Sequence, residues 1–278
     1  MKVYLYAKSG HTIGLDETKR CSVIANILNE FEPILCISDF RAGIFAKENL
    51  GVKKYVNIDV VRNLHNIMEK GDILIYDTSE VNEEMKKEMK EFSSLLYEIG
   101  KEIDGIIVDE LLYSKVLNPK LEKTIFFGDD DYNNFFLEMV KDSKKYEINL
   151  LIGHYFFLGN EKIFVNHFSN VIDEEEYVQT IQNSKYLLTA SLQTALESLA
   201  CGNKPVLFRR NDKMYNDDLI SKLNLPILEF TSFEELICQF ENIIESYPII
   251  SNFHITKFDN LVLEIKNKID IFNKLTNL

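Results

Sequence analysis

The sequence has few cysteines and none in a paired arrangement. Its four cysteines, Cys21, Cys36, Cys201 and Cys238, are scattered, with no Cys-x-x-Cys pair and no spacing typical of a zinc site. This pattern excludes a disulfide framework and a structural zinc centre. We therefore expect buried thiols in a protein of the reducing cytoplasm.

Basic side chains are also in short supply. Lys and Arg number 31 against 44 Asp and Glu, which gives a net charge of −13 at pH 7. No basic cluster is larger than a pair such as Arg209-Arg210 or Lys144-Lys145. Because contact with phosphate backbones requires a basic surface, we expect no nucleic-acid partner.

Long hydrophobic runs are missing as well. No run approaches the ~18 residues that a membrane span requires. Residues 1–2 lead directly into the strand-like run 3–7, which is too short for the apolar region of a signal peptide. The sequence thus predicts a soluble cytoplasmic protein. Its 278 residues, 46% of them hydrophobic, suffice for two domains with large cores.

The chain does contain a regular alternation of strand-like and helix-like segments. In the first half, the apolar runs are 3–7, 34–37, 54–57, 73–76 and 105–108, and the helical stretches are 18–31, 42–50, 60–70 and 82–99. This alternation predicts a parallel sheet covered by helices on both faces. Asp77 and Asp109 follow two of the runs, so we expect both at the carboxyl edge of the sheet, where such folds bind ligands.

A second alternation follows. Its expected strands are 148–152, 162–165, 186–189, 206–208 and 226–230, and its expected helices are 174–183, 192–200, 211–223, 233–245 and 258–275. We assign the run 123–127 to the first domain as its last strand. The expected domains are 1–141 and 142–255, with a terminal helix in 256–278. This predicts an α/β protein with two Rossmann-like domains that face a cleft.

A polar turn between a strand and a helix is the clearest candidate for a binding site. It reads Thr189-Ala190-Ser191, and the free backbone N–H groups from Ser191 to Thr194, with two hydroxyls and the helix dipole, suit a phosphate. Glu197, on the first turns of the helix, could accept hydrogen bonds from ribose hydroxyls. The alternative is that Ser191 and Thr194 only cap a helix and that Glu197 is a solvated acid.

Three other loops are candidates for ligand chemistry. The spacing Gly10-x-x-x-Gly14 does not match Gly-x-Gly-x-x-Gly, so we expect no nicotinamide or flavin cofactor. The three aspartates 129–131 could suggest a metal, but adjacent carboxylates rarely point the same way, and we favour a solvated turn that caps the next helix. Gly153 and His154 form a turn at the same topological place as the first loop, so His154 is a candidate to line the cleft.

Two segments carry a resemblance to known families. Residues 189–191 with Glu197 resemble the nucleotide-binding segment of GT-B glycosyltransferases. Residues 14–20 resemble the Gly-x-Gly-His-x-x-Arg signature of the GT-B-like UDP-sugar hydrolases of pseudaminic acid biosynthesis, in which Gly14 and Arg20 match. Residues 148–153 look like the strand and glycine-rich turn of that family. The resemblance implies hydrolysis of a UDP-linked diacetamido trideoxy sugar.

The signature is altered at its centre. Glu17 stands where the family has the catalytic histidine that handles the attacking water, and Asp16 replaces the second glycine. A carboxylate can act as a general base if burial raises its pKa, so Glu17 is the candidate catalytic residue. His11, on the same loop, is a possible substitute. Arg20 either faces phosphate or pairs with Asp16 or Glu17.

The resemblance assigns the sugar to the first domain and the nucleotide to the second. The expected substrate-binding residues are Gly14, Arg20, Asp77, Asp109, Gly153 and His154, and the expected nucleotide-binding residues are Ala190, Ser191, Thr194 and Glu197. No metal or cofactor is expected. The sequence therefore favours a divergent UDP-sugar hydrolase. The alternatives are a GT-B glycosyltransferase and a catalytically inactive homologue that binds a nucleotide sugar.

Overall fold

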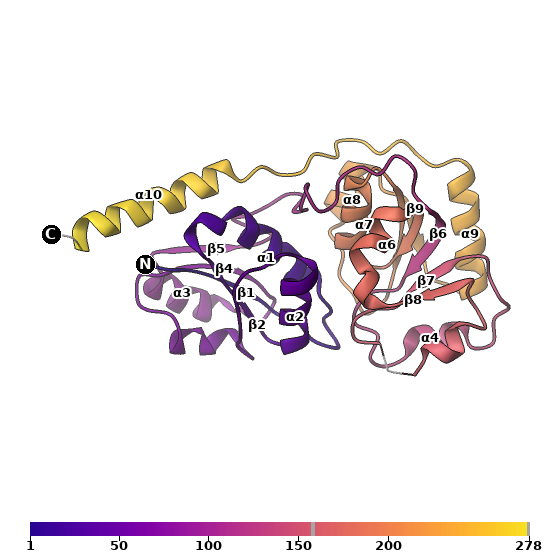
Figure 1. Cartoon of the computed structure of the whole chain (residues 1–278), viewed down its shortest axis with the longest axis horizontal. Helices are drawn as coiled ribbons and strands as arrows, with labels where there is room; N and C mark the ends of the chain where they lie inside the picture. The colour runs from indigo at the N-terminus through magenta and orange to yellow at the C-terminus, as the bar shows by residue number, and fades with distance from the viewer. Residues whose placement is uncertain (157–158, 277–278) are drawn as a thin grey trace. The chain divides into compact units, whose positions relative to one another are not determined.

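The computed structural model describes residues 1–156 and 159–276, and it divides the chain into two compact units. Unit 1 comprises Met1–Gly10, Glu17–Ile107 and Thr256–Leu278, and unit 2 comprises His11–Asp16 and Val108–Ile255. Each unit contains one sheet of parallel strands with helices around it (Figure 1). The chain is therefore an α/β protein with Rossmann-like units, as predicted.

Unit 1 is built on a five-stranded sheet with the order β3-β2-β1-β4-β5. Its strands are β1 (Val3–Ala7), β2 (Ile34–Ile37), β3 (Tyr55–Asn57), β4 (Ile73–Asp77) and β5 (Leu95–Glu98). Its helices are α1 (Asp16–Ile27), η1 (Asn29–Phe31), α2 (Phe40–Asn49), η2 (Val61–Asn66), α3 (Glu83–Phe92) and α10 (Asp259–Thr276). Every residue of β1 is buried, because a central parallel strand is covered on both faces.

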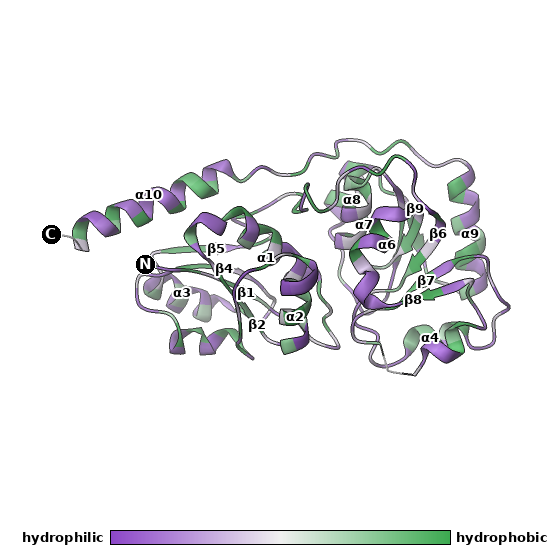
Figure 2. Cartoon of the chain, viewed as in Figure 1, coloured by the Kyte–Doolittle hydropathy of each residue, from purple (hydrophilic) through white to green (hydrophobic). Residues whose placement is uncertain are grey.

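The late segment of unit 1 is joined to its earlier part by a pair of hydrogen bonds. The Ile106 N–H donates to Thr256 Oγ1 at 2.9 Å, and the Thr256 N–H donates to the Ile106 carbonyl at 2.9 Å. Leu261 and Ile265 of α10 are buried, whereas the residues from 271 to 276 are exposed. Hydrophilic and hydrophobic residues alternate along α10 (Figure 2).

Unit 2 is built on a six-stranded parallel sheet with the order β11-β10-β9-β6-β7-β8. Its strands are β6 (Leu121–Phe126), β7 (Asn149–Leu151), β8 (Asn170–Ile172), β9 (Ser184–Thr189), β10 (Lys204–Arg209) and β11 (Ile227–Glu229). Its helices are α4 (Phe135–Val140), α5 (Glu161–Phe164), η3 (Glu174–Glu176), α6 (Tyr177–Asn183), α7 (Leu192–Ala200), α8 (Asp217–Leu223) and α9 (Phe233–Glu245). One core cluster is rich in phenylalanine, with Phe136 in contact with Phe164, Phe168 and Phe233.

The prediction that the run 123–127 closes the first sheet was wrong. This run forms β6, which pairs with β7 and β9 at the centre of the sheet of unit 2. The chain passes from unit 1 to unit 2 between Ile107 and Val108, ahead of the expected boundary at 141/142. Sheet membership depends on partners far away in the chain, and alternation alone does not encode it.

Three shorter assignments also differ from the structure. The expected helix 82–99 ends at Phe92, and β5 follows, because the apolar run at 95–97 completes the sheet beside β4. The expected strand 162–165 lies in the helix α5 and the turn after it. Residues 105–108 form no strand in the part of the chain that the structure describes.

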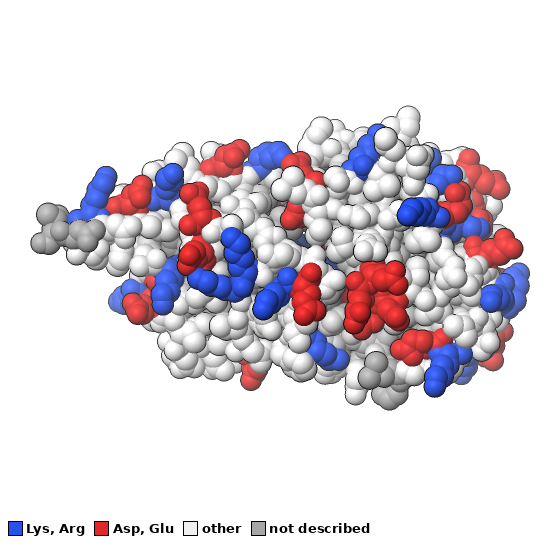
Figure 3. Space-filling model, in the orientation of Figure 1, with Lys and Arg blue, Asp and Glu red and all other residues white. Residues whose placement is uncertain are grey.

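The surface carries charges of both signs, and most of the cysteines are buried. On the face drawn in Figure 3, Lys and Arg side chains are interspersed with Asp and Glu side chains. Cys21, Cys36 and Cys201 are buried, as expected, and Cys238 is exposed. No helix within residues 1–156 and 159–276 combines the length and the apolar character that crossing a membrane requires.

Candidate functional site

The carboxyl ends of β6 and β9 meet at the point where the strand order of unit 2 reverses. Phe126 and Thr189 pair at the ends of these strands, and the Ala190 N–H donates to the Phe126 carbonyl at 3.4 Å. Open parallel sheets bind ligands just beyond such a switch point. The loop 128–131 and the turn 190–194 therefore form the candidate site.

The carboxylate of Asp16, from a distant segment of the chain, binds at the N-terminus of the helix that follows β9. Ser191 caps α7, with its Oγ accepting a hydrogen bond from the Thr194 N–H at 3.0 Å and from Thr194 Oγ1 at 2.8 Å. The Ser191 hydroxyl donates to the Asp16 carboxylate, whose two oxygens lie 2.8 and 3.0 Å away. The positive end of the helix dipole stabilises such an anion. The N-terminus of α7 thus already holds a carboxylate from the same unit.

Glu197 is buried inside unit 2 rather than solvated, with 2% of its surface exposed. Its carboxylate accepts hydrogen bonds from the Tyr177 hydroxyl at 2.7 Å and from Gln193 Nε2 at 3.1 Å. The Tyr177 oxygen also lies 2.8 Å from Thr194 Oγ1. Burial, and then the charge of Glu197, raises the pKa of Tyr177 and of Tyr113. A ribose could reach Glu197 only by displacing one of these partners.

The three aspartates after β6 are buried and turn to different partners. The exposed fractions of Asp129, Asp130 and Asp131 are 6%, 7% and 1%. The expectation of a solvated turn was therefore wrong, because protein donors take up these carboxylates. Among the described residues, no three His, Cys, Asp or Glu side chains are grouped so that they could hold a metal ion.

Asp131 caps the helix that follows it, as predicted. Its two carboxylate oxygens accept the N–H groups of Phe135 and Phe136 at 2.8 and 2.9 Å. Burial outweighs these hydrogen bonds and raises the pKa of Asp131 to about 6. A proton therefore binds this carboxyl more tightly in the folded chain than in the unfolded chain, where the pKa is about 3.9.

This pKa predicts how stability changes with pH. The stabilisation linked to Asp131 is complete below about pH 4 and is lost as the pH rises through about 6, because the native state holds the extra proton. From about pH 4 to about pH 7, the stability of the wild type should fall by roughly 2–3 kcal/mol relative to Asp131→Asn. Urea unfolding across this range measures the difference. A difference that does not change between pH 4 and pH 7 would contradict the prediction.

Two cations lie at the carboxyl edge of the same sheet. Arg210, directly after β10, contacts Asp130 at 2.9 Å and Asp212 at 2.6 Å, and Lys213 contacts Asp130 at 3.1 Å. Burial would lower the pKa of Lys213, but the charges of Asp130 and then Asp16 raise it above its usual value. Both cations are therefore charged at neutral pH. Lys213 also interacts with the charge of Asp16, whose carboxylate lies at the N-terminus of α7.

The turn after β7 packs directly against the loop after β6. A Cβ atom on Gly153 would lie 2.0 Å from the carbonyl oxygen of Gly128 and 2.9 Å from the Cα of Asp129. The His154 N–H donates to Asp129 Oδ1 at 3.2 Å, and the His154 ring lies edge-on to Tyr155. Gly153 and His154 therefore border the switch point.

The segment His11–Asp16 brings two further predicted residues to unit 2. Gly14 has φ +93, and a Cβ atom there would lie 3.6 Å from the Cβ atoms of two aspartates in the loop after β6. The ring of His11 lies 4.8 Å from the ring of Tyr132, between centroids. This segment therefore places Gly14 beside the loop after β6 and His11 beside Tyr132.

The remaining predicted residues lie elsewhere. Arg20, on α1 of unit 1, donates from Nε to Asp77 Oδ2 at 2.7 Å, at the carboxyl end of β4. Glu17 also lies on α1, where it is half-buried. Asp109 does not end a strand, because none forms before it. It accepts the N–H groups of the two leucines at 111 and 112 and holds a turn.

A pocket of about 280 Å³ opens beside Arg210 in unit 2. The guanidinium lies over the ring of Phe127, with 4.3 Å from Cζ to the ring centroid. The other lining residues are Phe135, Met139, Phe208, Asn211, Asp212 and Phe230. Aromatic walls with one cation suit a planar ring that carries polar groups.

Sequence reasoning missed several members of this site. Arg210 had a usable signal, since it directly follows a strand, at the edge where ligands bind. Lys213 and Tyr177 had none, because their roles depend on contacts with distant segments. Comparison with models of known protein families and with curated proteins finds no match to this chain.

Proposed function

We propose that this chain is a nucleotide-sugar-processing protein whose unit 2 binds the nucleoside diphosphate. The observation that carries the proposal is the Asp16 carboxylate on Ser191, at the N-terminus of α7 and beside the switch point. Rossmann-like sheets bind phosphate at such helix ends. The GT-B-like pairing of the two units is part of this proposal.

The charges around Asp16 support a diphosphate at this position. A phosphate that displaces Asp16 would keep the Ser191 hydroxyl and the helix dipole, and it would take over the interaction with Lys213. The pocket beside Arg210 has a size and lining suited to a nucleobase. Departure of UDP builds negative charge on its phosphate, and the same helix end would stabilise that charge.

The proposed reaction is hydrolysis of a UDP-sugar at the anomeric carbon, the reaction implied by the resemblance of residues 14–20. Glu17 is the proposed general base. Release of UDP from a panel of UDP-sugars tests this, with Glu17→Ala and Ser191→Ala as variants. Turnover that Glu17→Ala abolishes would support hydrolysis, and turnover that needs an added acceptor would support a glycosyltransferase. Release of UDP at the same background rate from wild type and both variants would contradict an enzyme.

A binding prediction follows from Asp16. Its carboxylate competes with any phosphate at α7, since two like charges at about 4 Å repel by roughly 1–4 kcal/mol. The Asp16→Asn variant should therefore bind UDP and inorganic pyrophosphate at least about tenfold more tightly than the wild type. Isothermal titration calorimetry measures both affinities. Ser191→Ala should weaken binding, and failure of UDP to bind both the wild type and Asp16→Asn would refute the nucleotide site.

A catalytically inactive homologue is the second candidate. Two observations favour it: the family histidine is replaced by Glu17, and the position for phosphate is occupied by Asp16. Such a protein would bind UDP but would not cleave any UDP-sugar. Binding without turnover in the two assays above therefore separates the candidates.

A further inference from the structure

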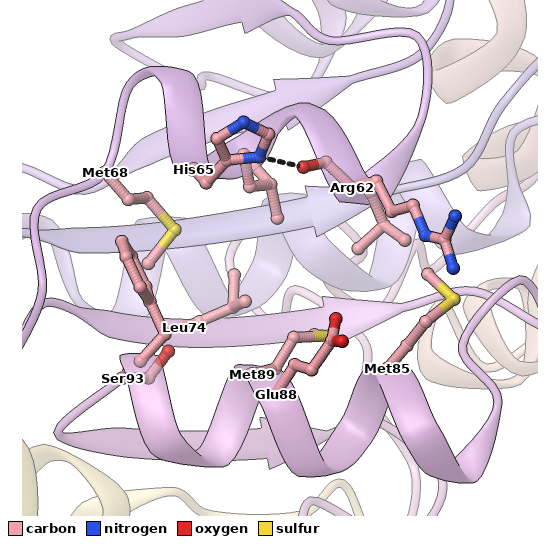
Figure 4. A pocket seen from close by; sticks show the side chains of 11 residues that line it. Arg62, His65, Met68, Leu74, Met85, Glu88, Met89 and Ser93 are labelled. Carbon is pink, nitrogen blue, oxygen red and sulfur yellow. Dashed lines mark hydrogen bonds between the residues drawn. The ribbon is translucent and has the colours of Figure 1, made fainter.

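Unit 1 contains an apolar pocket, separate from the site of unit 2, between η2 and α3 (Figure 4). Its volume is about 230 Å³, and Leu74 of β4 and three methionines, Met68, Met85 and Met89, line it. The connection from β3 to β4 carries only the six-residue η2, whereas α1 and α2 have 12 and 10 residues. A helix this short covers less of the sheet and leaves the space open.

Two opposite charges border this pocket. Arg62 comes from η2 and Glu88 from α3, and Figure 4 shows them on facing elements. Within residues 1–156 and 159–276, neither side chain forms an ion pair or a side-chain hydrogen bond. The nearby His65 ring is instead held by the carbonyl of Arg62, 2.5 Å from its Nδ1. The pocket thus offers one unpaired cation and one unpaired anion.

We propose that this pocket binds an apolar α-amino acid, such as phenylalanine or leucine. The ligand carboxylate pairs with Arg62, its ammonium group pairs with Glu88, and its side chain lies among the methionines. A dry cavity of about 150 Å³ holds benzene, so this larger pocket has room for a phenyl or branched side chain. Flexible thioethers make favourable contacts with aromatic rings and adapt to aliphatic ones.

The position of binding can be tested directly by NMR, because the chain has only six methionines. With 13C-labelled methionine methyl groups, millimolar L-phenylalanine or L-leucine should shift the signals of Met68, Met85 and Met89. The signals of Met139 and Met214, which belong to unit 2, should not move. No shift at the three pocket methionines with either amino acid would overturn the proposal.

The two charges are tested by variants and by analogues. Arg62→Gln and Glu88→Gln should each weaken L-phenylalanine binding at least about tenfold, since each removes a charge-assisted contact. Glu84→Gln, an exposed acid one turn earlier on α3, is the control and should leave the affinity unchanged. Phenylacetate and phenethylamine each lack one charge and should bind at least about tenfold more weakly. Unchanged affinity in both charge variants, or equal affinity for these analogues, would overturn the proposal.

Discussion

The Gly153→Ala variant is expected to lose about 3 kcal/mol or more of the stability of unit 2. The added methyl group would lie 2.0 Å from the Gly128 carbonyl oxygen, and that oxygen belongs to the loop after the central strand β6. Backbone cannot move aside as a flexible side chain can. The two loops must therefore separate, and the hydrogen bond between His154 and Asp129 would be lost with them.

Thiol labelling shows which unit opens. Cys201 is buried in unit 2 and Cys21 in unit 1, so in Gly153→Ala the labelling of Cys201 at low urea should speed up while that of Cys21 stays slow. The control is Gly71→Ala, where φ is +97 and an added Cβ meets open space. That variant should cost only the roughly 1–2 kcal/mol of the left-handed conformation. Equal losses in the two variants would contradict the close approach at Gly153.

The Arg210→Met variant is expected to destabilise unit 2 by about 3 kcal/mol. Arg210 and Asp130 are each 7% exposed, and removal of the guanidinium leaves the Asp130 carboxylate buried with Lys213 as its remaining cation. The neighbouring Arg209 pairs with Asp217 and Glu229 at the surface. Arg209→Met is therefore the matched control, with an expected loss below about 1 kcal/mol.

A double variant separates the charge from the packing. Asp130→Asn together with Arg210→Met removes the buried Asp130 charge along with its partner, so it should recover part of the stability lost in Arg210→Met alone. Urea unfolding followed by circular dichroism measures all of these variants. If the double variant is no more stable than Arg210→Met, the loss comes from packing and the ion-pair explanation is wrong.

The best-predicted part of the chain is the stretch around Ser191. The expected strand 186–189 and helix 192–200 agree with β9 and α7 to within two residues. All the signals needed are local, because a serine cap precedes the helix and Gly202 follows it. Where neighbouring residues determine the secondary structure, the sequence alone predicts it.

The site itself was less predictable, because its contacts join distant residues. Asp16 and Ser191 are 175 positions apart, and Tyr177 and Glu197 lie on different helices. Periodicity located Ser191 and Glu197 but gave no means to find their partners. The same holds for β6, whose place in the sheet depends on β9 rather than on its own residues.

The order of the segments has a consequence for synthesis on the ribosome. Thr256 contacts Ile106, so the last piece of unit 1 is made only after all of unit 2. Unit 2 obtains its own early piece, residues 11–16, long before residue 255 is translated. In most chains the first domain folds first. Here a chain that ends at residue 255 and has left the ribosome should already protect Cys201 from thiol reagents, while unit 1 still lacks Thr256 and helix α10.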